Sequence, residues 1–495
     1  MASTLVDTRY GRVQGVREGG VSIWRGIPYA RAPVGPLRFR PPEPPLPWTG
    51  IRDATRFGPA AVQITDHVFV QDVPAAQSED CLHLNIWSPD ADGMRRPVLV
   101  WIHGGAFVFG SGQNPWYDGT AFAAQGDIVV VTINYRLGPF GFLHLVEAGG
   151  GAYAASGNAG LLDQVAALRW VRDNIAAFGG DPARVTIAGE SAGSMSVGAL
   201  MTMPAARGLF GQAIFESGIP AFLDAEAAAQ SARHVLDTLG IGRDEVGKLQ
   251  TVPAADILAA AQTFPKGSGL RLWPVLDGNS VPHSFWDALA SGATDHIPVL
   301  AGSNHDELML WGALDPTWRQ LDAQAMVARF EAEWGTISPP IREYYLADKA
   351  GEDLFVALMR IGTLRVFQFP TWKMAAVHSV RAPTWLYRFD WESRAFGGVL
   401  KACHALEIPF VFNTLAAPGV TEVTGDIPTR AAVAHRMHGY WTGFVRTGRP
   451  QGDGLPDWPS YDADRRATML FNVQTRVEQD PDAEERRLWE ETIGP

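Results

Sequence analysis

The pentapeptide Gly189-Glu190-Ser191-Ala192-Gly193 is the stretch around which the rest of the chain is organised. It follows the mostly β-branched run 185–188, typical of a buried strand, and precedes 194–201, typical of a helix that begins on small residues. A Gly-x-Ser-x-Gly motif between a strand and a helix is the setting of a nucleophile elbow. In an elbow the serine occupies a strained turn, and its hydroxyl lies beside the positive end of the helix. The alternative is a glycine-rich turn that happens to contain serine; the flanking strand and helix favour the elbow, with Ser191 as nucleophile.

Strand-like and helix-like segments alternate along most of the chain. The predicted strands are 82–87, 97–102, 128–133, 185–188, 212–215, 297–301 and 384–389, and helical segments such as 161–178 and 226–239 lie between them. This alternation predicts an α/β protein with a large, mostly parallel sheet and helices on both faces. Glycines in the segment 5–23 predict an N-terminal antiparallel hairpin or meander. We find no repeat or linker, so we expect a single domain, 1–495, with loop insertions.

The composition excludes several classes of protein. Hydrophobic residues make up 46% of the chain and charged residues 19%, which indicates a large core rather than a disordered chain. The net charge of −12 and the lack of a basic stripe argue against a nucleic-acid partner. No apolar run reaches the ~18 residues of a membrane helix, and the first residues do not resemble a signal peptide. We therefore expect a cytoplasmic protein with no membrane partner.

The chain has two cysteines, Cys81 and Cys403. Two thiols on distant segments are no disulfide framework and are too few for a metal site. Cys403 precedes a histidine, but neighbours in sequence rarely face each other, so a buried thiol is the favoured interpretation. We expect both thiols to be free, and we expect neither a metal nor a cofactor.

Prolines interrupt regular structure from residue 26 to residue 47. A linker is one interpretation of this segment. Aromatic residues are interleaved with the prolines, however, and favour burial: Trp24, Tyr29, Phe39 and Trp48. We therefore expect a long loop that packs on the body of the protein.

A serine nucleophile needs a base, an acid that orients the base, and donors for the oxyanion. In sheets of this type these groups follow the order serine, acid, histidine, each on a loop after a strand. The acidic pair Asp306-Glu307 follows the strand 297–301, and either carboxylate is a candidate for the acid. The segment 103–107 (His-Gly-Gly-Ala-Phe) follows the strand 97–102 and is predicted to bind the oxyanion. Its N–H groups and that of Ala192 are expected to converge on one oxygen.

Eight histidines follow Ser191 in the sequence, and one of them is best placed to be the base. His404 follows the strand 384–389, across a loop that contains Gly397-Gly398. The other candidates fall on helical stretches or share the loop of the acid: His378, His435, His438 and His305. A purely structural role for His404 is the alternative.

Several long motifs of the chain resemble, in sequence and in order, those of the type-B carboxylesterases, the cholinesterase-like branch of the α/β-hydrolases. The motifs are 26–39, 79–85, 103–107, 134–138, 157–164, 189–193, the Asp306-Glu307 loop and 404–412. The resemblance runs almost from end to end. It implies the α/β-hydrolase fold, with loop insertions that line an active-site gorge.

The resemblance also implies a role for individual residues. It implies Ser191 as nucleophile, Glu307 rather than Asp306 as acid, and His404 as base. It also implies that the Ser217 hydroxyl supports the acid and that Glu190 supports the site. The other implied residues are the oxyanion donors Gly105, Ala106 and Ala192, the pocket residues Phe107, Leu308, Met309, Leu310 and Trp311, and the structural ion pairs Arg38–Glu79 and Arg136–Asp163.

Two departures from the family pattern affect these expectations. Secreted members pair the cysteine that corresponds to Cys81 with one upstream, and this chain has none, so Cys81 is expected to be free. The family usually has glycine after the acidic pair, whereas this chain has Leu308, so the segment 308–311 is expected to shape the acyl pocket differently.

The function expected from these features is hydrolysis of uncharged carboxylic esters through an acyl-enzyme. Amide or carbamate hydrolysis by the same chemistry is one alternative. A non-catalytic binding module is another, but such family members lack part of the triad, whereas Ser191, Glu307 and His404 are all present. The expected partner is a small-molecule ester, and the expected state is a monomer or weak homodimer.

Overall fold

The computed structural model of the protein describes residues 4–63, 76–265 and 268–494. Its centre is an eleven-stranded sheet in the order β14-β13-β12-β11-β10-β9-β7-β8-β6-β4-β3. These strands are β3 Val16–Glu18, β4 Val21–Pro28, β6 His83–Ser88, β7 Arg96–Ile102, β8 Val129–Ile133, β9 Gly180–Glu190, β10 Gln212–Glu216, β11 Val299–Asn304, β12 Thr384–Phe389, β13 Ala467–Phe471 and β14 Arg476–Gln479. The strands from β8 to β13 are all parallel, and the pairs at both ends are antiparallel. The prediction of a large, mostly parallel sheet is confirmed.

The N-terminal segment contributes to two sheets rather than one. β1 (Leu5–Thr8) and β2 (Gly11–Gln14) form the predicted antiparallel hairpin, and β5 (Ile51–Asp53) pairs with β2 in parallel to complete a small separate sheet. The next hairpin, β3 and β4, joins the edge of the large sheet instead.

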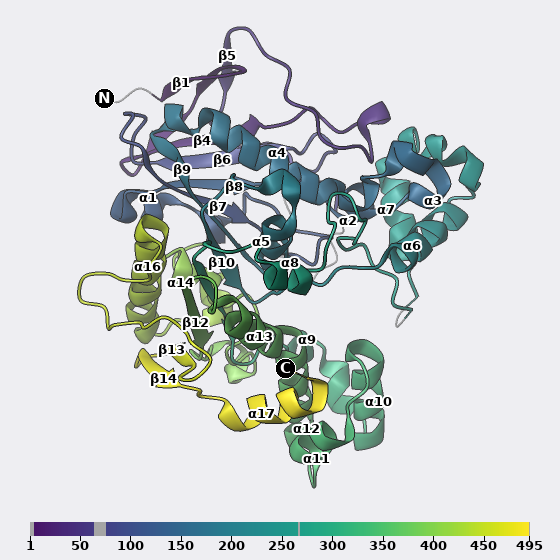
Figure 1. The fold of residues 1–495 in the computed structure, drawn as a ribbon, viewed down its shortest axis with the longest axis vertical. Helices are drawn as coiled ribbons and strands as arrows, with labels where there is room; N and C mark the ends of the chain where they lie inside the picture. The colour runs from purple at the N-terminus through teal and green to yellow at the C-terminus, as the bar shows by residue number, and fades with distance from the viewer. Residues whose placement is uncertain (1–3, 64–75, 266–267, 495) are drawn as a thin grey trace.

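Both faces of the large sheet are covered. Neighbouring residues of a strand point to opposite faces, so each face has its own hydrophobic cluster. In β7, Val100 belongs to one hydrophobic cluster and Trp101 to the other, and both are buried. Helix α4 (Ala159–Asn174) packs in the first cluster, and α16 (Thr429–Thr447) in the second (Figure 1). Parallel strands buried on both faces explain the nearly unbroken apolar runs in the sequence.

The proline-rich segment is a long loop packed on the body of the protein, as expected. Tyr29 and Phe39 are buried, and Trp48 is half-buried. β4 extends through Pro28, so the first three residues assigned to the loop belong to a strand. The Arg38 guanidinium fixes the loop through an ion pair of 2.5 Å with Glu79.

Three helices between β11 and β12 in the chain form a separate group with the C-terminal helix. α10 (Ala323–Trp334), α11 (Pro339–Leu346) and α12 (Gly351–Thr363) lie together, and the C-terminal helix α17 (Ala483–Ile493) contacts α11 (Figure 1). Within the ranges that the structure describes, no helix has the length and apolar character needed to cross a bilayer.

Helix α12 continues into α13 (Phe369–His378) through a π-helical turn at Leu364–Gln368. Pro370 is the second residue after this turn. Because proline has no N–H, it cannot donate the hydrogen bond that an uninterrupted α-helix needs at that position. The π turn therefore falls where the sequence prevents regular α-helical bonding.

Candidate active site

Ser191 occupies a sharp turn between β9 and the helix α5 (Ala192–Thr202). Its φ of 56° lies in the left-handed region, which is strained for any residue but glycine. Both motif glycines are required by space. A Cβ on Gly189 would lie 2.6 Å from the Ile102 carbonyl oxygen, and one on Gly193 would lie 2.0 Å from the same atom. The turn is the elbow geometry that the pentapeptide predicts.

The backbone around Ser191 is fixed, whereas its side chain is partly exposed. The Ser191 N–H donates to the Glu216 carbonyl at 2.9 Å, which attaches the elbow to β10. The first N–H groups of α5 have no acceptor within the helix, so its positive end lies beside Ser191. The elbow therefore presents a hydroxyl in an electropositive setting.

The structure brings His404 and Glu307 together. Glu307 follows β11, His404 follows β12, and His404 Nδ1 lies 2.7 Å from Glu307 Oε2. The other carboxylate oxygen accepts from the Asn304 N–H at 2.7 Å. Both side chains are buried, so the carboxylate has one fixed orientation and aims at the imidazole.

A second carboxylate faces the other ring nitrogen. His404 Nε2 lies 3.0 Å from Glu190 Oε1, and no hydrogen bond joins the Ser191 hydroxyl to His404 among the described residues. Ser191 follows Glu190 directly, so the imidazole is close to the elbow but turned toward its acidic residue. Of the predicted triad, the structure therefore joins acid and base, and it leaves the bond between base and nucleophile unmade.

The pKa of His404 reflects this position between two carboxylates. Burial alone lowers the pKa of the imidazole, but the charges of Glu190 and Glu307 outweigh burial and hold the pKa well above its ordinary value. Burial raises the pKa of Glu190, and the nearby His404 opposes that effect. The two carboxylates therefore stabilise the charged form of the imidazole against the effect of burial.

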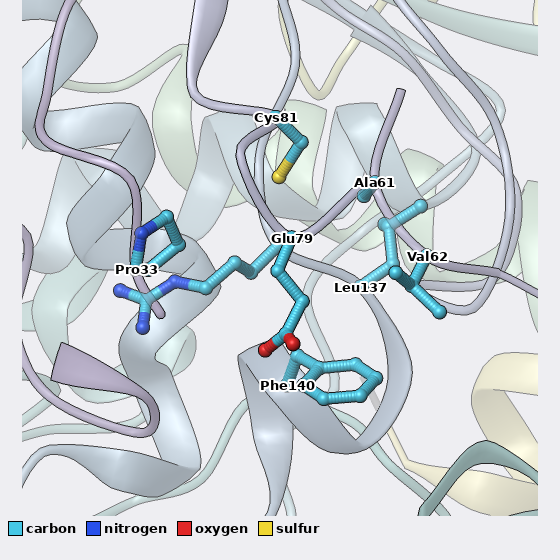
Figure 2. Close-up of a pocket in the computed structure, with 8 residues that line it drawn as sticks. Pro33, Ala61, Val62, Glu79, Cys81, Leu137 and Phe140 are labelled. Atoms are coloured by element: carbon cyan, nitrogen blue, oxygen red, sulfur yellow. The ribbon is translucent and has the colours of Figure 1, made fainter. Parts of the chain in front are cut away.

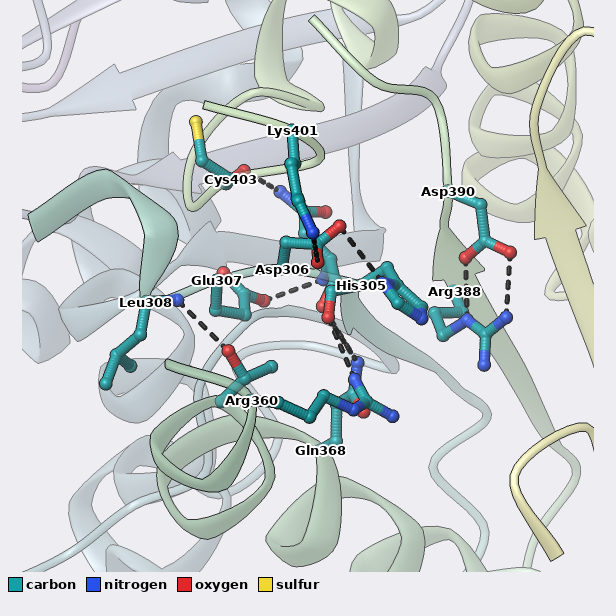
Figure 3. Close-up of polar contacts among 12 residues, drawn as sticks. His305, Asp306, Glu307, Leu308, Arg360, Gln368, Arg388, Asp390, Lys401 and Cys403 are labelled. Carbon is teal, nitrogen blue, oxygen red and sulfur yellow. Dashed lines mark hydrogen bonds and ion pairs between the residues drawn. The ribbon is translucent and has the colours of Figure 1, made fainter. Parts of the chain in front are cut away.

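Asp306 faces away from His404. Its carboxylate lies 3.0 Å from His305 Nδ1 and 3.9 Å from Lys401 Nζ (Figure 3). Burial raises the pKa of Asp306, but its hydrogen bond with His305 and the charges of His305, Lys401 and Arg360 outweigh burial, and the pKa lies below its usual range. Of the acidic pair, it is Glu307 that meets the candidate base.

Ser217 contacts a carboxylate other than the predicted one. Its hydroxyl donates to Glu407 Oε1 at 3.5 Å, whereas the resemblance implies support of Glu307. Glu407 Oε2 accepts from Asn304 Nδ2 at 2.5 Å, and the Asn304 N–H binds Glu307, so the two acids are linked through one asparagine. Sequence reasoning missed Glu407, although it stands three residues after His404 within a quoted motif.

The predicted oxyanion segment lies against the elbow. A Cβ on Gly104 would lie 3.1 Å from the Ser191 Cβ. Gly105 and Ala106 have φ values of 104° and 52°, and a Cβ on Gly105 would lie 2.1 Å from the Phe109 carbonyl oxygen. Neither the Gly105 nor the Ala106 N–H donates to any residue in the described part of the chain. Two free donors therefore stand next to the candidate nucleophile.

The predicted pocket residues divide into two groups. Leu308, Met309 and Leu310 are buried in one hydrophobic cluster, at the start of the short helix α9 (Met309–Leu314). Trp311 is 40% exposed, and its ring centroid lies 5.0 Å from that of His404. Trp311 therefore lies against the imidazole of the candidate base.

Phe107 and Phe367 differ in whether they contact His404. Phe107 is buried against Phe142 rather than against His404. Phe367, which sequence reasoning missed, has its ring 4.8 Å from the His404 ring. Phe367 lies on the π turn, and nothing in its own stretch of sequence indicates this contact.

The two ion pairs that the resemblance implies are present, and both cysteines are free. Arg136 and Asp163 form a buried ion pair of 2.7 Å, alongside the pair of Arg38 and Glu79. Cys81 and Cys403 are free and buried. Cys81 lies beside Glu79 and Phe140 at a cavity of about 10 Å³, and burial raises the pKa of its thiol (Figure 2). No group of three or more metal-ligating side chains occurs within the described ranges.

Comparisons with known proteins agree along the whole chain. Residues 2–489 match the model of the carboxylesterase family. The chain is 41% identical to para-nitrobenzyl esterase of Bacillus subtilis, with 98% of each chain covered, and 36% identical to phenmedipham hydrolase of Pseudarthrobacter oxydans, with 94% of each covered. The crystal structure of the Geobacillus stearothermophilus carboxylesterase EST55 superimposes with a TM-score of 0.90 at 47% identity, covering 98% of this chain and 100% of that one. The chain therefore belongs to the carboxylesterase family, has the α/β-hydrolase fold of its structural neighbours, and is a carboxylic-ester hydrolase.

Proposed function

We propose that the protein is a serine esterase that hydrolyses uncharged carboxylic esters through Ser191, His404 and Glu307. The observation that carries the proposal is the 2.7 Å contact between His404 Nδ1 and the buried Glu307 carboxylate, next to a strained serine turn. A carboxylate at this nitrogen fixes the imidazole tautomer and stabilises the imidazolium that forms during reaction.

In acylation, the Ser191 hydroxyl attacks the ester carbonyl and its proton passes to His404 Nε2. The tetrahedral oxyanion accepts hydrogen bonds from the N–H groups of Gly105, Ala106 and Ala192. Collapse breaks the bond to the alkoxy group, which leaves as the alcohol with the proton from His404. The acyl group stays on Ser191.

In deacylation, a water molecule gives a proton to His404 Nε2 and attacks the acyl carbon. The second tetrahedral species collapses, and the proton returns from His404 to the serine oxygen. The acid product and free Ser191 result. For both steps the imidazole must turn Nε2 from Glu190 toward Ser191, and Glu190 stabilises the imidazolium between them.

The charge around the base supports uncharged substrates. The Glu190 and Glu307 carboxylates both face the imidazole. Negative charge close to the scissile carbonyl would be repelled by these groups in a site of low dielectric. Esters without a negatively charged acyl or alcohol group avoid that repulsion.

The test is covalent capture of the nucleophile. A phosphonyl fluoride reacts with an activated serine by forming an O–P bond with loss of fluoride, and peptide mass mapping then locates the adduct. We expect one adduct, on Ser191, and none in Ser191→Ala. The matched control is Ser194→Ala, because Ser194 is buried in the same helix and donates to the Gly218 carbonyl. An adduct on another residue, with turnover lost in parallel, would refute the assignment of Ser191.

A further inference from the structure

The loop that carries Glu307 is bound by three side chains of a single helix. The Arg360 guanidinium donates to the His305 carbonyl at 2.9 Å, and the Gln368 amide donates to the Asn304 carbonyl at 2.9 Å. The Leu308 N–H donates to the Thr363 hydroxyl at 3.1 Å. Figure 3 shows these bonds converging on the main chain at 304–308 from below. We refer to Arg360, Thr363 and Gln368 as the clamp.

The π turn aligns the clamp. Residues three apart, such as Arg360 and Thr363, share one face of an α-helix. Gln368 lies five residues beyond Thr363, a spacing that does not share a face in an α-helix, but the i→i+5 bonding of a π turn places it one turn above. The same turn directs Phe367 onto the His404 ring. Because of this π turn, one continuous helix contacts the loop of Glu307 through Gln368 and the ring of His404 through Phe367.

Two members of the clamp, Thr363 and Gln368, are buried, and Arg360 is half-buried. Gln368 is only 1% exposed, and its Oε1 has no partner in the described ranges. The Arg360 charge is balanced by Glu485, at 3.0 Å from Nε, and by Asp482, at 3.7 Å from Nη2, both in or beside α17. A buried charge requires such partners. The C-terminal helix therefore supplies the carboxylate that lets Arg360 reach the loop.

We propose that Arg360, Thr363 and Gln368 are positioning residues of the hydrolysis, which hold the main chain at 304–308 so that the Glu307 carboxylate stays in contact with His404 Nδ1. The proposal rests on the proposed function of Glu307 as the acid. None of the three is expected to touch the ester. They act through the loop, and the alternative is a contribution to stability alone.

Loosening the clamp has two consequences that a purely structural role does not share. A displaced Glu307 stabilises the imidazolium less well, so kcat falls while KM stays close to that of the parent. The carboxylates that face His404 are Glu190 and Glu307, and its other neighbours are the rings of Trp311 and Phe367. With Glu307 displaced, the pKa of His404 falls, and the acid limb of the pH profile moves to lower pH.

The first test is Gln368→Met, with Arg365→Met as the matched control. Arg365 lies on the same π turn, but it donates to the carbonyls of Trp334, Gly335 and Thr336, away from the acid loop. We expect Gln368→Met to lower kcat about 10- to 100-fold, as a displacement near 1 Å does, with KM unchanged and the acid limb moved down. Arg365→Met is expected to lower Tm only. Equal kcat and equal acid limbs in the two variants would overturn the proposal.

A second pair of variants keeps the test open if Gln368→Met does not fold. Thr363→Val removes the acceptor of the Leu308 N–H with little change in volume, and Thr363→Ser keeps it. We expect Val to lower kcat and move the acid limb, and Ser to restore both. If Val and Ser behave alike, the clamp does not position the loop.

Glu307→Gln, measured in parallel, separates this proposal from the proposed function. Activity retained in Glu307→Gln refutes Glu307 as the acid, and the clamp with it. If Glu307→Gln loses activity while Gln368→Met and Thr363→Val keep the kcat and pH profile of the parent, only the clamp is refuted. Rates are taken per active site, counted by phosphonyl fluoride titration.

Discussion

His404 Nε2 lies 3.0 Å from Glu190 Oε1, at the ring nitrogen that Glu307 does not use. The residue that precedes the candidate nucleophile thus faces the nitrogen that has to accept the nucleophile's proton. The imidazole has a carboxylate at each nitrogen. In the proposed mechanism Ser191 competes with Glu190 for one of these nitrogens. This relationship determines how the activity should depend on pH.

The acid limb of the kcat/KM profile should lie above the ordinary histidine pKa of ~6.5. The pKa of His404 is raised by the charges of Glu190 and Glu307 against the effect of burial, and only the neutral imidazole accepts the serine proton. Activity therefore rises as pH rises through this elevated pKa. In Glu190→Gln the limb should move to lower pH, whereas Asp306→Asn should leave it in place. A parent midpoint at or below ~6.5 would contradict the inferred environment.

Glu307→Gln should be far more damaging than Asp306→Asn. The Glu307 carboxylate contacts His404 Nδ1, whereas the Asp306 carboxylate contacts His305 and faces away. A neutral amide does not stabilise the imidazolium, so kcat should fall by about 10⁴ in the first variant and by less than about tenfold in the second. Steady-state kinetics of both purified variants give the comparison. A larger loss in the Asp306 variant would reverse the two roles.

Adding a methyl group at Gly105 should lower the activity, whereas removing the methyl group of Ala106 should preserve it. Gly105→Ala places a Cβ 2.1 Å from the Phe109 carbonyl oxygen, so the segment has to move, and kcat should fall about 10²- to 10³-fold. Ala106→Gly only relieves a φ of 52°, so activity should persist and stability should rise by up to about 1 kcal/mol. Kinetics and thermal unfolding of both variants check this. Equal activity in the two would place the oxyanion donors elsewhere.

Glu216→Gln should stabilise the protein increasingly as pH rises from 5 to 8. Burial raises the pKa of Glu216 from 4.5 to about 8, against the bond from Trp441 Nε1. The unfolded chain loses this proton near pH 4.5 and the folded one near pH 8, so unfolding releases a proton between these values and stability of the parent falls there. Glutamine removes the dependence, worth roughly 3 kcal/mol at pH 7.

Denaturant unfolding of parent and Glu216→Gln, at several pH values between 5 and 8, measures this difference. The glutamine oxygen still accepts from Trp441, so the comparison isolates the proton. A difference in unfolding free energy that does not change with pH would mean that Glu216 is ionised in the folded protein.

Local rules explain which features were predictable. The elbow follows from Gly189 and Gly193, because their places in the turn leave no room for a Cβ. The sheet follows from apolar runs that only strands buried on both faces need. The acid and base follow from their positions after β11 and β12, since the carboxyl ends of parallel strands meet at one edge of the sheet.

The remaining contacts depend on packing between distant segments. The sequence shows that Pro370 interrupts a helix, but not that a π turn results or that Phe367 then meets His404. Nor does it show that Ser217 binds Glu407, because that bond joins residues 190 positions apart. Nor does it show that Leu308, Met309 and Leu310 are buried in a hydrophobic cluster. The resemblance implies them as residues of the acyl pocket, and that role stays a prediction.

The proposed mechanism depends on Ser191 as the nucleophile. Measuring kcat of Ser191→Ala on a chromogenic short-chain ester, with Tm on the same sample, tests this assignment. The hydroxyl is partly exposed and outside the core, so Tm should stay close to that of the parent. The account predicts a loss of about 10⁴- to 10⁶-fold in kcat in a folded protein. Activity within about tenfold of the parent would contradict it.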